Sequence, residues 1–214
     1  LVLSKGHVCP ALYAALAQKG FFPWEELKTF RRVGSRLQGH PDLNKAPGVD
    51  FTAGSLGQGV SAAAGIALAG KIAGKNYRVY AILGDGELQE GEVWESAMFS
   101  AHYKLDNLCY IIDNNGLQID GNIQDVCSPY PIDKKFEAFG FEVIVIDGHD
   151  FDQIEAAVEK AKTVTGKPVA IIAKTVKGKG VSFMEGKASW HGSAPNEEQY
   201  KTAMDDLAKI EEVL

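Results

Sequence analysis

Small polar residues follow two apolar runs of the sequence, and their side chains could bind a metal ion. Gly84-Asp85-Gly86 follows the run 77–83, and Asn114-Asn115-Gly116 follows the run 108–113. An apolar run that ends abruptly in this way is typical of a buried parallel strand. Because ligands bind outside the carboxyl ends of such strands, we expect Asp85 and Asn115 to face one crevice. A carboxylate, an amide and backbone carbonyls suit a hard cation such as Mg²⁺, which also binds substrate phosphates.

The alternative for Gly84-Asp85-Gly86 is a tight turn between a strand and a helix, with Asp85 as the helix cap. The asparagines after the next strand count against that alternative. Glu87, Glu90, Glu92 and Glu95 follow Gly86, and acidic residues near a helix start also favour the helix dipole. Beside a metal site, however, this surplus negative charge requires another partner, which favours a specific role for Glu90 and Glu95.

Three histidines stand next to glycine in loops or at the edges of predicted elements, and they are His7, His40 and His191. A single loop histidine is usually exposed polar surface, but three in this setting favour a common role. Imidazole suits proton transfer and hydrogen bonding to charged oxygens near neutral pH. His102 and His149 lack this setting, and we interpret them as structural.

The segment 52–59 is a glycine-rich turn that leads into a helix rich in glycine and alanine. Backbone N–H groups at such a helix start can bind an anion. The alternative is that these glycines serve only close packing.

Strands and helices alternate along the chain, which predicts one α/β domain with a doubly wound parallel sheet and helices on both faces. A long loop, 34–54, interrupts this order, and loops of that length are usually functional. The predicted strands are 79–83, 108–113, 141–146 and 168–173. The predicted helices are 9–19, a short one from residue 23, one within 55–73, then 91–103, 133–139, one after the cap Asp150, and one after the cap Asn196 with Tyr200, Met204, Leu207 and Ile210 on one face.

Composition excludes several classes of protein. The chain has 214 residues and a formal net charge of −6, which argues against nucleic-acid binding. Three cysteines without a metal-binding spacing fit a reducing cytoplasm. No run approaches the roughly 18 apolar residues of a membrane span, and no signal peptide is visible. Because the sequence begins at Leu1 inside a patterned segment, we expect that an upstream N-terminal segment precedes it.

The motifs together resemble the thiamine-diphosphate enzymes, and within them the diphosphate-binding domain of transketolases. The span from Gly84-Asp85-Gly86 to Asn115 is similar to the thiamine-diphosphate motif of the whole superfamily. The similar segments, in the transketolase order from about Ser4 to Pro195, are 4–7, 39–42, 54–59, 84–91, 119–121 and 191–192. The resemblance implies one thiamine-diphosphate-binding domain over residues 1–214.

The resemblance also implies roles for individual residues. Asp85 and Asn115 through their side chains, and Leu117 through its carbonyl, would bind Mg²⁺, or Ca²⁺ or Mn²⁺ in its place. The residues implied to contact thiamine diphosphate are His7, Gly54, Ser55, Leu56, Gly84, Asp85, Gly86, Glu87, Asn115, Leu117, Ile119 and His191. His7, His40 and His191 would assist proton movement at substrate oxygens. Glu90, which we group with the catalytic residues, and Glu95 would lie at a subunit contact.

The implied reaction transfers a two-carbon ketol group from a ketose phosphate to an aldose phosphate in the pentose phosphate pathway. In this family a pyrimidine-binding domain follows, and it carries the glutamate that activates the cofactor. No second α/β unit is present here, so the resemblance implies the N-terminal subunit of a two-chain transketolase, or an excised domain. The partner would be a C-terminal subunit, in an α2β2 heterotetramer or beside a homodimer contact.

Several alternatives remain open on the sequence alone. A fragment of 1-deoxyxylulose-5-phosphate synthase shares the cofactor fold and a similar Lys-Gly-Lys-Gly loop, but the segments 39–41 and 86–91 favour transketolase. A 2-oxo acid dehydrogenase subunit would not be expected to carry the segment 54–59. A non-catalytic subunit that only binds thiamine diphosphate is disfavoured by the three histidines. A Mg²⁺-dependent phosphotransferase is disfavoured because no P-loop lysine motif occurs.

Overall fold

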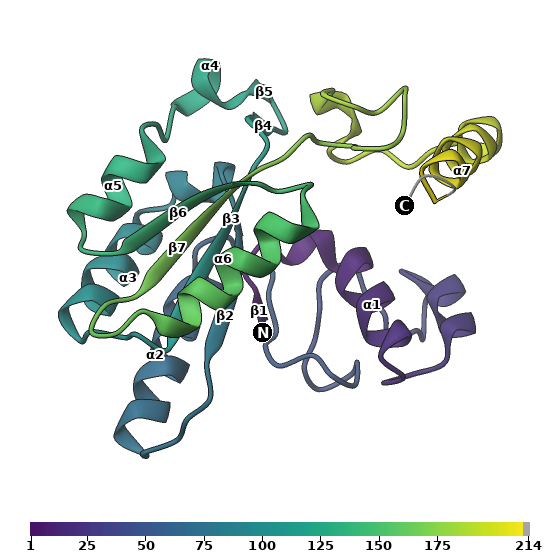
Figure 1. The fold of residues 1–214 in the computed structure, drawn as a ribbon. Helices are drawn as coiled ribbons and strands as arrows, with labels where there is room; N and C mark the ends of the chain where they lie inside the picture. The colour runs from purple at the N-terminus through teal and green to yellow at the C-terminus, as the bar shows by residue number, and fades with distance from the viewer. Residues whose placement is uncertain (212–214) are drawn as a thin grey trace.

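The computed structural model describes residues 1–211, which fold around one five-stranded parallel sheet (Figure 1). All neighbouring strands of this sheet run parallel. In spatial order they are β1 (Val2–Leu3), β2 (Val79–Gly84), β3 (Leu108–Asn114), β7 (Val169–Lys174) and β6 (Glu142–Asp147). The predicted doubly wound α/β fold is confirmed.

Helices cover both faces of the sheet because the chain reverses its direction across it. From β2 to β3 and on to β6 the chain moves one way, and α3 (Gly91–His102) and α5 (Ile132–Ala138) form the crossovers. From β6 it returns to β7 through α6 (Phe151–Thr163). Since crossovers between parallel strands are right-handed, the return places α6 on the opposite face.

The hydrophobic core is accordingly divided by the sheet. One cluster packs α2 (Gln58–Ile72), α3 and α5 on the face that carries Tyr110 and Ile112. On the other face, α6 packs near β7 and α1 (Cys9–Gln18) packs near β1. The small residues of α2 allow a close approach, because a Cβ on Gly59 would lie 2.7 Å from the Cα of Ser4.

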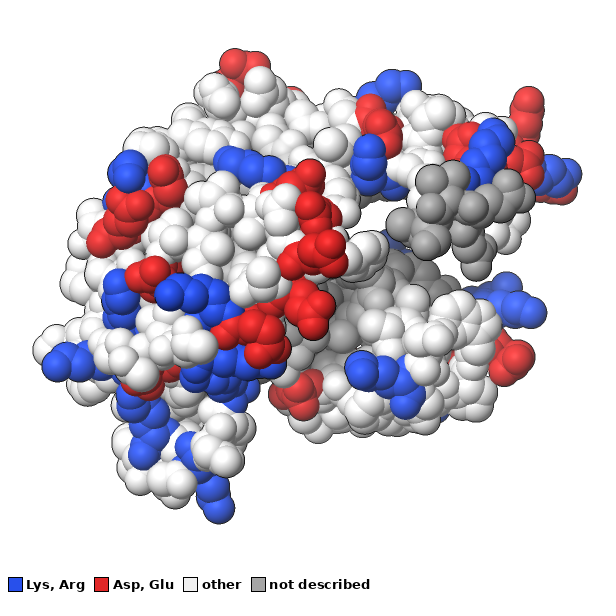
Figure 2. Space-filling view, viewed as in Figure 1, with Lys and Arg blue, Asp and Glu red and all other residues white. Residues whose placement is uncertain are grey.

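Polar and charged side chains at the two ends of α6 complement its helix dipole. Asp150 caps α6 by accepting a hydrogen bond from the Gln153 N–H at 3.1 Å, as its sequence position predicts. Figure 2 shows acidic side chains gathered over the first turns of α6, whereas Lys160 and Lys162 stand in its last turn. This distribution stabilises the helix through its dipole.

Several short elements of the structure were not predicted from the sequence. They are β1, the hairpin of β4 (Leu117–Gln118) and β5 (Gly121–Asn122), α4 (Ile123–Cys127), and the 3-10 helices η1 (Gly6–Val8), η3 (Gly86–Gln89) and η4 (Ala188–Trp190). The short helix predicted from residue 23 is also a 3-10 helix, η2 (Trp24–Thr29). The strands predicted at 141–146 and 168–173 each lie one residue further along the chain.

The last helix, α7 (Glu197–Glu211), lies beyond the sheet in Figure 1 and contacts the loop after β7. Asp206 accepts hydrogen bonds from the Ser182 hydroxyl at 2.6 Å and from the Ser182 N–H at 3.0 Å. The predicted apolar face exists, but its residues remain partly exposed, from Tyr200 at 56% to Ile210 at 40%. Within residues 1–211, no helix is long and apolar enough to cross a membrane. All three cysteines are free thiols.

Candidate cofactor site

All five strands of the main sheet point their carboxyl ends at one cavity. Its volume is about 710 Å³. The residues that line it at the strand ends are Lys5 and His7 after β1, Gly84, Asp85, Gly86 and Glu87 after β2, Asp113 and Asn115 at β3, His149 after β6, and Thr175, Val176, Lys177 and Gly178 after β7. This edge is where ligands of a doubly wound sheet bind.

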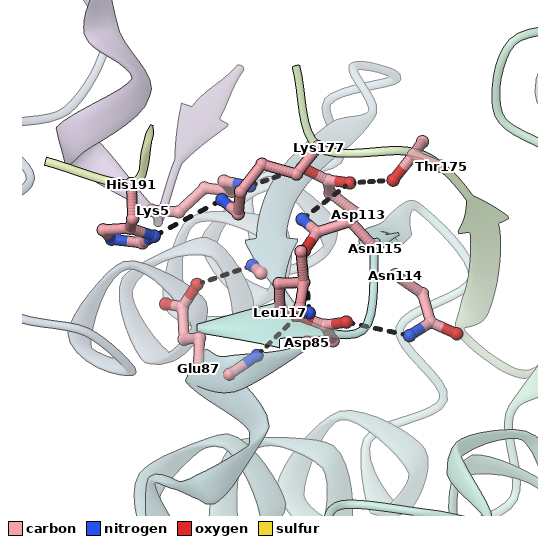
Figure 3. Close-up of polar contacts among 12 residues, drawn as sticks. Lys5, Asp85, Glu87, Asp113, Asn114, Asn115, Leu117, Thr175, Lys177 and His191 are labelled. Carbon is pink, nitrogen blue, oxygen red and sulfur yellow. Dashed lines mark hydrogen bonds and ion pairs between the residues drawn. The ribbon is translucent and has the colours of Figure 1, made fainter. Parts of the chain in front are cut away.

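Asp85 is 1% exposed and is held by neutral hydrogen-bond donors (Figure 3). Its Oδ1 accepts a hydrogen bond from the Gly86 N–H at 2.9 Å. Its Oδ2 accepts hydrogen bonds from the Gly116 N–H at 2.6 Å and the Asn114 Nδ2 at 2.9 Å. These donors fix the carboxylate at the cavity without cancelling its charge, which leaves it suited to a cation.

Asn115 and Leu117 follow β3 in a turn that brings both to the cavity wall. The Leu117 N–H donates to the Asn115 Oδ1 at 3.0 Å, and Gly116 between them has a φ of 75°, which favours glycine. Among residues 1–211, no group of three or more His, Cys, Asp or Glu could hold a metal ion. A carboxylate, an amide and a backbone carbonyl are nevertheless oxygen donors of the kind that a hard cation accepts, and such a cation also binds phosphate and water oxygens.

An ion pair crosses the cavity floor. The Lys5 Nζ lies 2.6 Å from the Asp113 Oδ2, and the Thr175 hydroxyl donates to the same carboxylate. Burial acts to raise the pKa of Asp113, but Lys5 and the hydrogen bonds outweigh it and hold that pKa below its usual value. These residues join β1, β3 and β7. No sequence pattern singled them out, although Lys5 lies inside a motif and Asp113 directly precedes the asparagines.

His7 and His191 meet at the cavity, near Lys5 and Lys177. Their ring centroids are 5.1 Å apart, and the Lys177 Nζ lies 3.3 Å from the His191 Nδ1. Burial and the nearby charge of Lys5 lower the pKa of His7 to about 4. Burial and Lys177 also lower the pKa of His191. Burial and neighbouring positive charge therefore favour the neutral form of both rings, which can donate or accept hydrogen bonds.

We expect the His7 imidazole to remain neutral down to about pH 4, against an ordinary value of 6.5. Burial and neighbouring positive charge both disfavour the protonated ring. An NMR titration with ring-labelled histidine would measure this, and His7→Gln would assign the signal by its loss. A His7 signal that titrates at pH 6.5 or above would contradict this expectation.

The structure brings most of the residues selected from the sequence together. His7, Leu56, Gly84, Asp85, Gly86, Glu87, Glu90, Asn115, Leu117, Ile119 and His191 line the cavity. His40, Gly54, Ser55 and Glu95 do not belong to its lining, although the charge of His40 contributes to lowering the pKa of His7.

His149, interpreted as structural, also lines the cavity, and its Nε2 accepts a hydrogen bond from the Val176 N–H at 2.8 Å. This bond holds the loop that follows β7. No spacing in the sequence indicates it.

The sequence of this chain matches a known family over nearly its whole length. Residues 1–208 match the family described as "Transketolase, thiamine diphosphate binding domain". The chain belongs to the transketolase family.

The similar transketolases include both separate subunits and single-chain enzymes. A 6-deoxy-6-sulfo-D-fructose transketolase subunit of Clostridium sp. (strain MSTE9) is 50% identical over 98% of this chain and 76% of that protein. One subunit of an apulose-4-phosphate transketolase from Actinobacillus succinogenes is 42% identical over 96% of this chain and 74% of that protein. The transketolase of Homo sapiens is 48% identical over 89% of this chain, but the match spans 30% of that protein.

A solved transketolase shares the fold. The crystal structure of the transketolase from Campylobacter jejuni superposes with a TM-score of 0.91 at 38% identity, over 97% of this chain and 34% of that one. This transketolase chain thus corresponds to about a third of that single-chain enzyme. It is an N-terminal, thiamine-diphosphate-binding domain, homologous to transketolases and to separate transketolase subunits. These relatives favour transketolase over deoxyxylulose-phosphate synthase.

Proposed function

We propose that this chain is the N-terminal subunit of a two-chain transketolase that transfers a two-carbon ketol group from a ketose phosphate to an aldose phosphate. The observation that carries the proposal is the cavity at which Asp85, Asn115 and Leu117 meet His7 and His191. The match to this chain covers about three quarters of the length of each relative that is named a transketolase subunit, which supports a separate partner chain.

Asp85, Asn115 and the Leu117 carbonyl would hold a divalent cation, for which we propose Mg²⁺, and through it the cofactor diphosphate. When bound, thiamine diphosphate supplies the nucleophilic carbon that cleaves the bond beside the ketose carbonyl. His7 and His191, whose rings favour the neutral form, would bond to substrate hydroxyl oxygens and assist proton movement there. We assign the same role to His40, whose charge contributes to lowering the pKa of His7. Glu90, at the exposed rim, would face a partner subunit in an α2β2 assembly.

The free thiols support a reducing, cytoplasmic location. For the enzyme we propose a role in sugar-phosphate metabolism, in the pentose phosphate pathway or beside it. A second candidate donor is a 6-deoxy-6-sulfo-ketose, because the relative that is 50% identical is a subunit of a transketolase for such a sugar. The two candidates share the cofactor site and differ in the group that the partner chain must recognise.

The test mixes this chain with the polypeptide encoded in the adjacent reading frame, thiamine diphosphate and Mg²⁺. Ketol transfer to an aldose phosphate is measured with fructose 6-phosphate or its 6-deoxy-6-sulfo analogue as the donor. We expect activity in the mixture and none from either chain alone. Activity from this chain alone would contradict partner dependence. Cofactor binding without activity under all conditions would indicate a non-catalytic binding subunit.

A further inference from the structure

Glu87 is a second buried carboxylate, two positions from Asp85, and the residue is 2% exposed. Its Oε1 accepts hydrogen bonds from the Ser4 hydroxyl and from the Gly57 N–H, the latter at 2.9 Å. Its Oε2 accepts a hydrogen bond from the Gly84 N–H at 3.1 Å. Figure 3 shows this carboxylate bonded to a backbone nitrogen and separate from the group around Asp85.

The three donors come from segments that are distant in the sequence but adjacent at the cavity. Ser4 follows β1, Gly57 precedes α2, and Gly84 ends β2. Gly57 is the N-cap residue of α2, has a φ of 85°, and provides no side-chain cap. Glu87 therefore accepts the N–H of the N-cap residue, one of the orphan donors at this helix start.

A carboxylate suits this position because all three contacts are donors to it. An ionised carboxylate only accepts hydrogen bonds, and its bonds to N–H and O–H groups are stronger than those of a neutral amide. Burial raises the pKa of Glu87, although the hydrogen bonds and the charge of Lys5 oppose that effect. Both oxygens are occupied by protein donors, so the carboxylate is directed into the protein framework rather than at a ligand.

We propose that Glu87 is a positioning residue that holds the loop before α2 against the ends of β1 and β2, and so sets the wall of the cavity at Leu56 and Gly84. In this role Glu87 acts through Gly57 and Gly84, because both of its oxygens bond to protein donors, and not through the direct cofactor contact that the resemblance implies. The inference uses the proposed function only in choosing thiamine diphosphate with Mg²⁺ as the probe.

Glu87→Gln tests the proposal with a side chain of the same size. The glutamine amide has one acceptor oxygen, so its NH₂ group must face either the Gly84 N–H or the Gly57 N–H, where two donors oppose each other. We expect the affinity for thiamine diphosphate, measured by calorimetry with the partner chain present, to fall by about tenfold or more. Hydrogen exchange of this chain should show faster exchange at the Gly57 and Gly84 amides.

Tyr110→Phe is the matched control. The Tyr110 hydroxyl is buried and bonds to the Ser96 hydroxyl at 2.8 Å, but it lies in the core and not at the cavity. This variant should lower the thermal midpoint while leaving cofactor affinity and the exchange at Gly57 unchanged. An equal loss of affinity in Tyr110→Phe would show that general destabilisation is enough, which would overturn the proposal.

Ser4→Ala provides a milder variant that decides the question if Glu87→Gln does not fold. It removes one of the three donors and should weaken cofactor binding and Gly57 protection in the same direction, by less than Glu87→Gln. Unchanged affinity and exchange in the folded variants would overturn the positioning role. If the wild-type protein itself fails to bind the cofactor, the proposed function is wrong, while the exchange at Gly57 still tests the role of Glu87.

Discussion

Replacing Asp85 with asparagine or alanine is expected to lower the affinity for thiamine diphosphate by about 100-fold or more, since even outer-shell partners of a metal contribute 10- to 100-fold. Asp85 is the buried carboxylate at the end of β2, and its hydrogen-bond donors are neutral. Without this ligand the cation would bind more weakly, and the charge of the cofactor diphosphate would be poorly neutralised. Asp85→Asn keeps the size of the side chain and removes its charge, but its NH₂ group must also face one of the donors that now bond to Asp85.

Calorimetric titration of thiamine diphosphate, with and without Mg²⁺ and in the presence of the partner chain, measures the change. The wild-type protein should show a strong dependence on Mg²⁺, and the Asp85 variants should show neither the affinity nor the dependence. Asp120→Asn is the matched control, because Asp120 is an exposed carboxylate at the rim of the same cavity. Equal affinity in Asp85→Asn and wild type would remove the metal assignment.

Replacing His191 with alanine is expected to lower turnover by about 100-fold, with a much smaller effect on cofactor affinity. His191 lies beside His7 and Lys177 on the side of the cavity formed after β7, whereas the proposed metal ligands follow β2 and β3. Its neutral ring suits proton transfer at a substrate oxygen, which alanine cannot perform.

Steady-state kinetics of the two-chain enzyme and cofactor titrations would be measured on the same preparations. His102→Ala serves as the control, because His102 is exposed at the end of α3 and does not line the cavity. If His191→Ala kept full turnover, the ring would have no role in proton transfer. A loss of cofactor affinity as large as the loss of turnover would place His191 on the cofactor instead.

Asp85 and Asn115 could be proposed from the sequence because their signal is local, whereas Leu117 was implied only by the family resemblance. Apolar runs that end in Gly84-Asp85 and Asp113-Asn114 reveal both the strands and the crevice edge, and the structure pairs Gly84 with Asp113 in register. The pairing of Lys5 with Asp113 could not be predicted in this way. It spans 108 positions and depends on β1, whose two residues are too short for any periodic pattern.

The contacts of the predicted helices also depend on long-range packing, so the sequence pattern does not reveal them. The spacing of Tyr200, Met204 and Leu207 correctly predicted an amphipathic α7, but it does not indicate which surface that face meets. The position of His149 at the cavity could not be predicted either, because it depends on a contact between distant segments. Its neighbour Val176 lies after a different strand, and only the pairing of β6 with β7 brings the two together.

The position of β7 between β3 and β6 affects the order in which the chain can fold during synthesis. β7 lies between β3 and β6 but is the last strand of the sheet to leave the ribosome. Until residue 174 has emerged, β3 and β6 have no common neighbour, and their apolar edges stay open to wrong pairing. Lys5, Asp113 and Thr175 then meet in the same late event that closes the sheet. A nascent chain therefore acquires its ligand cavity only when folding of the sheet is complete.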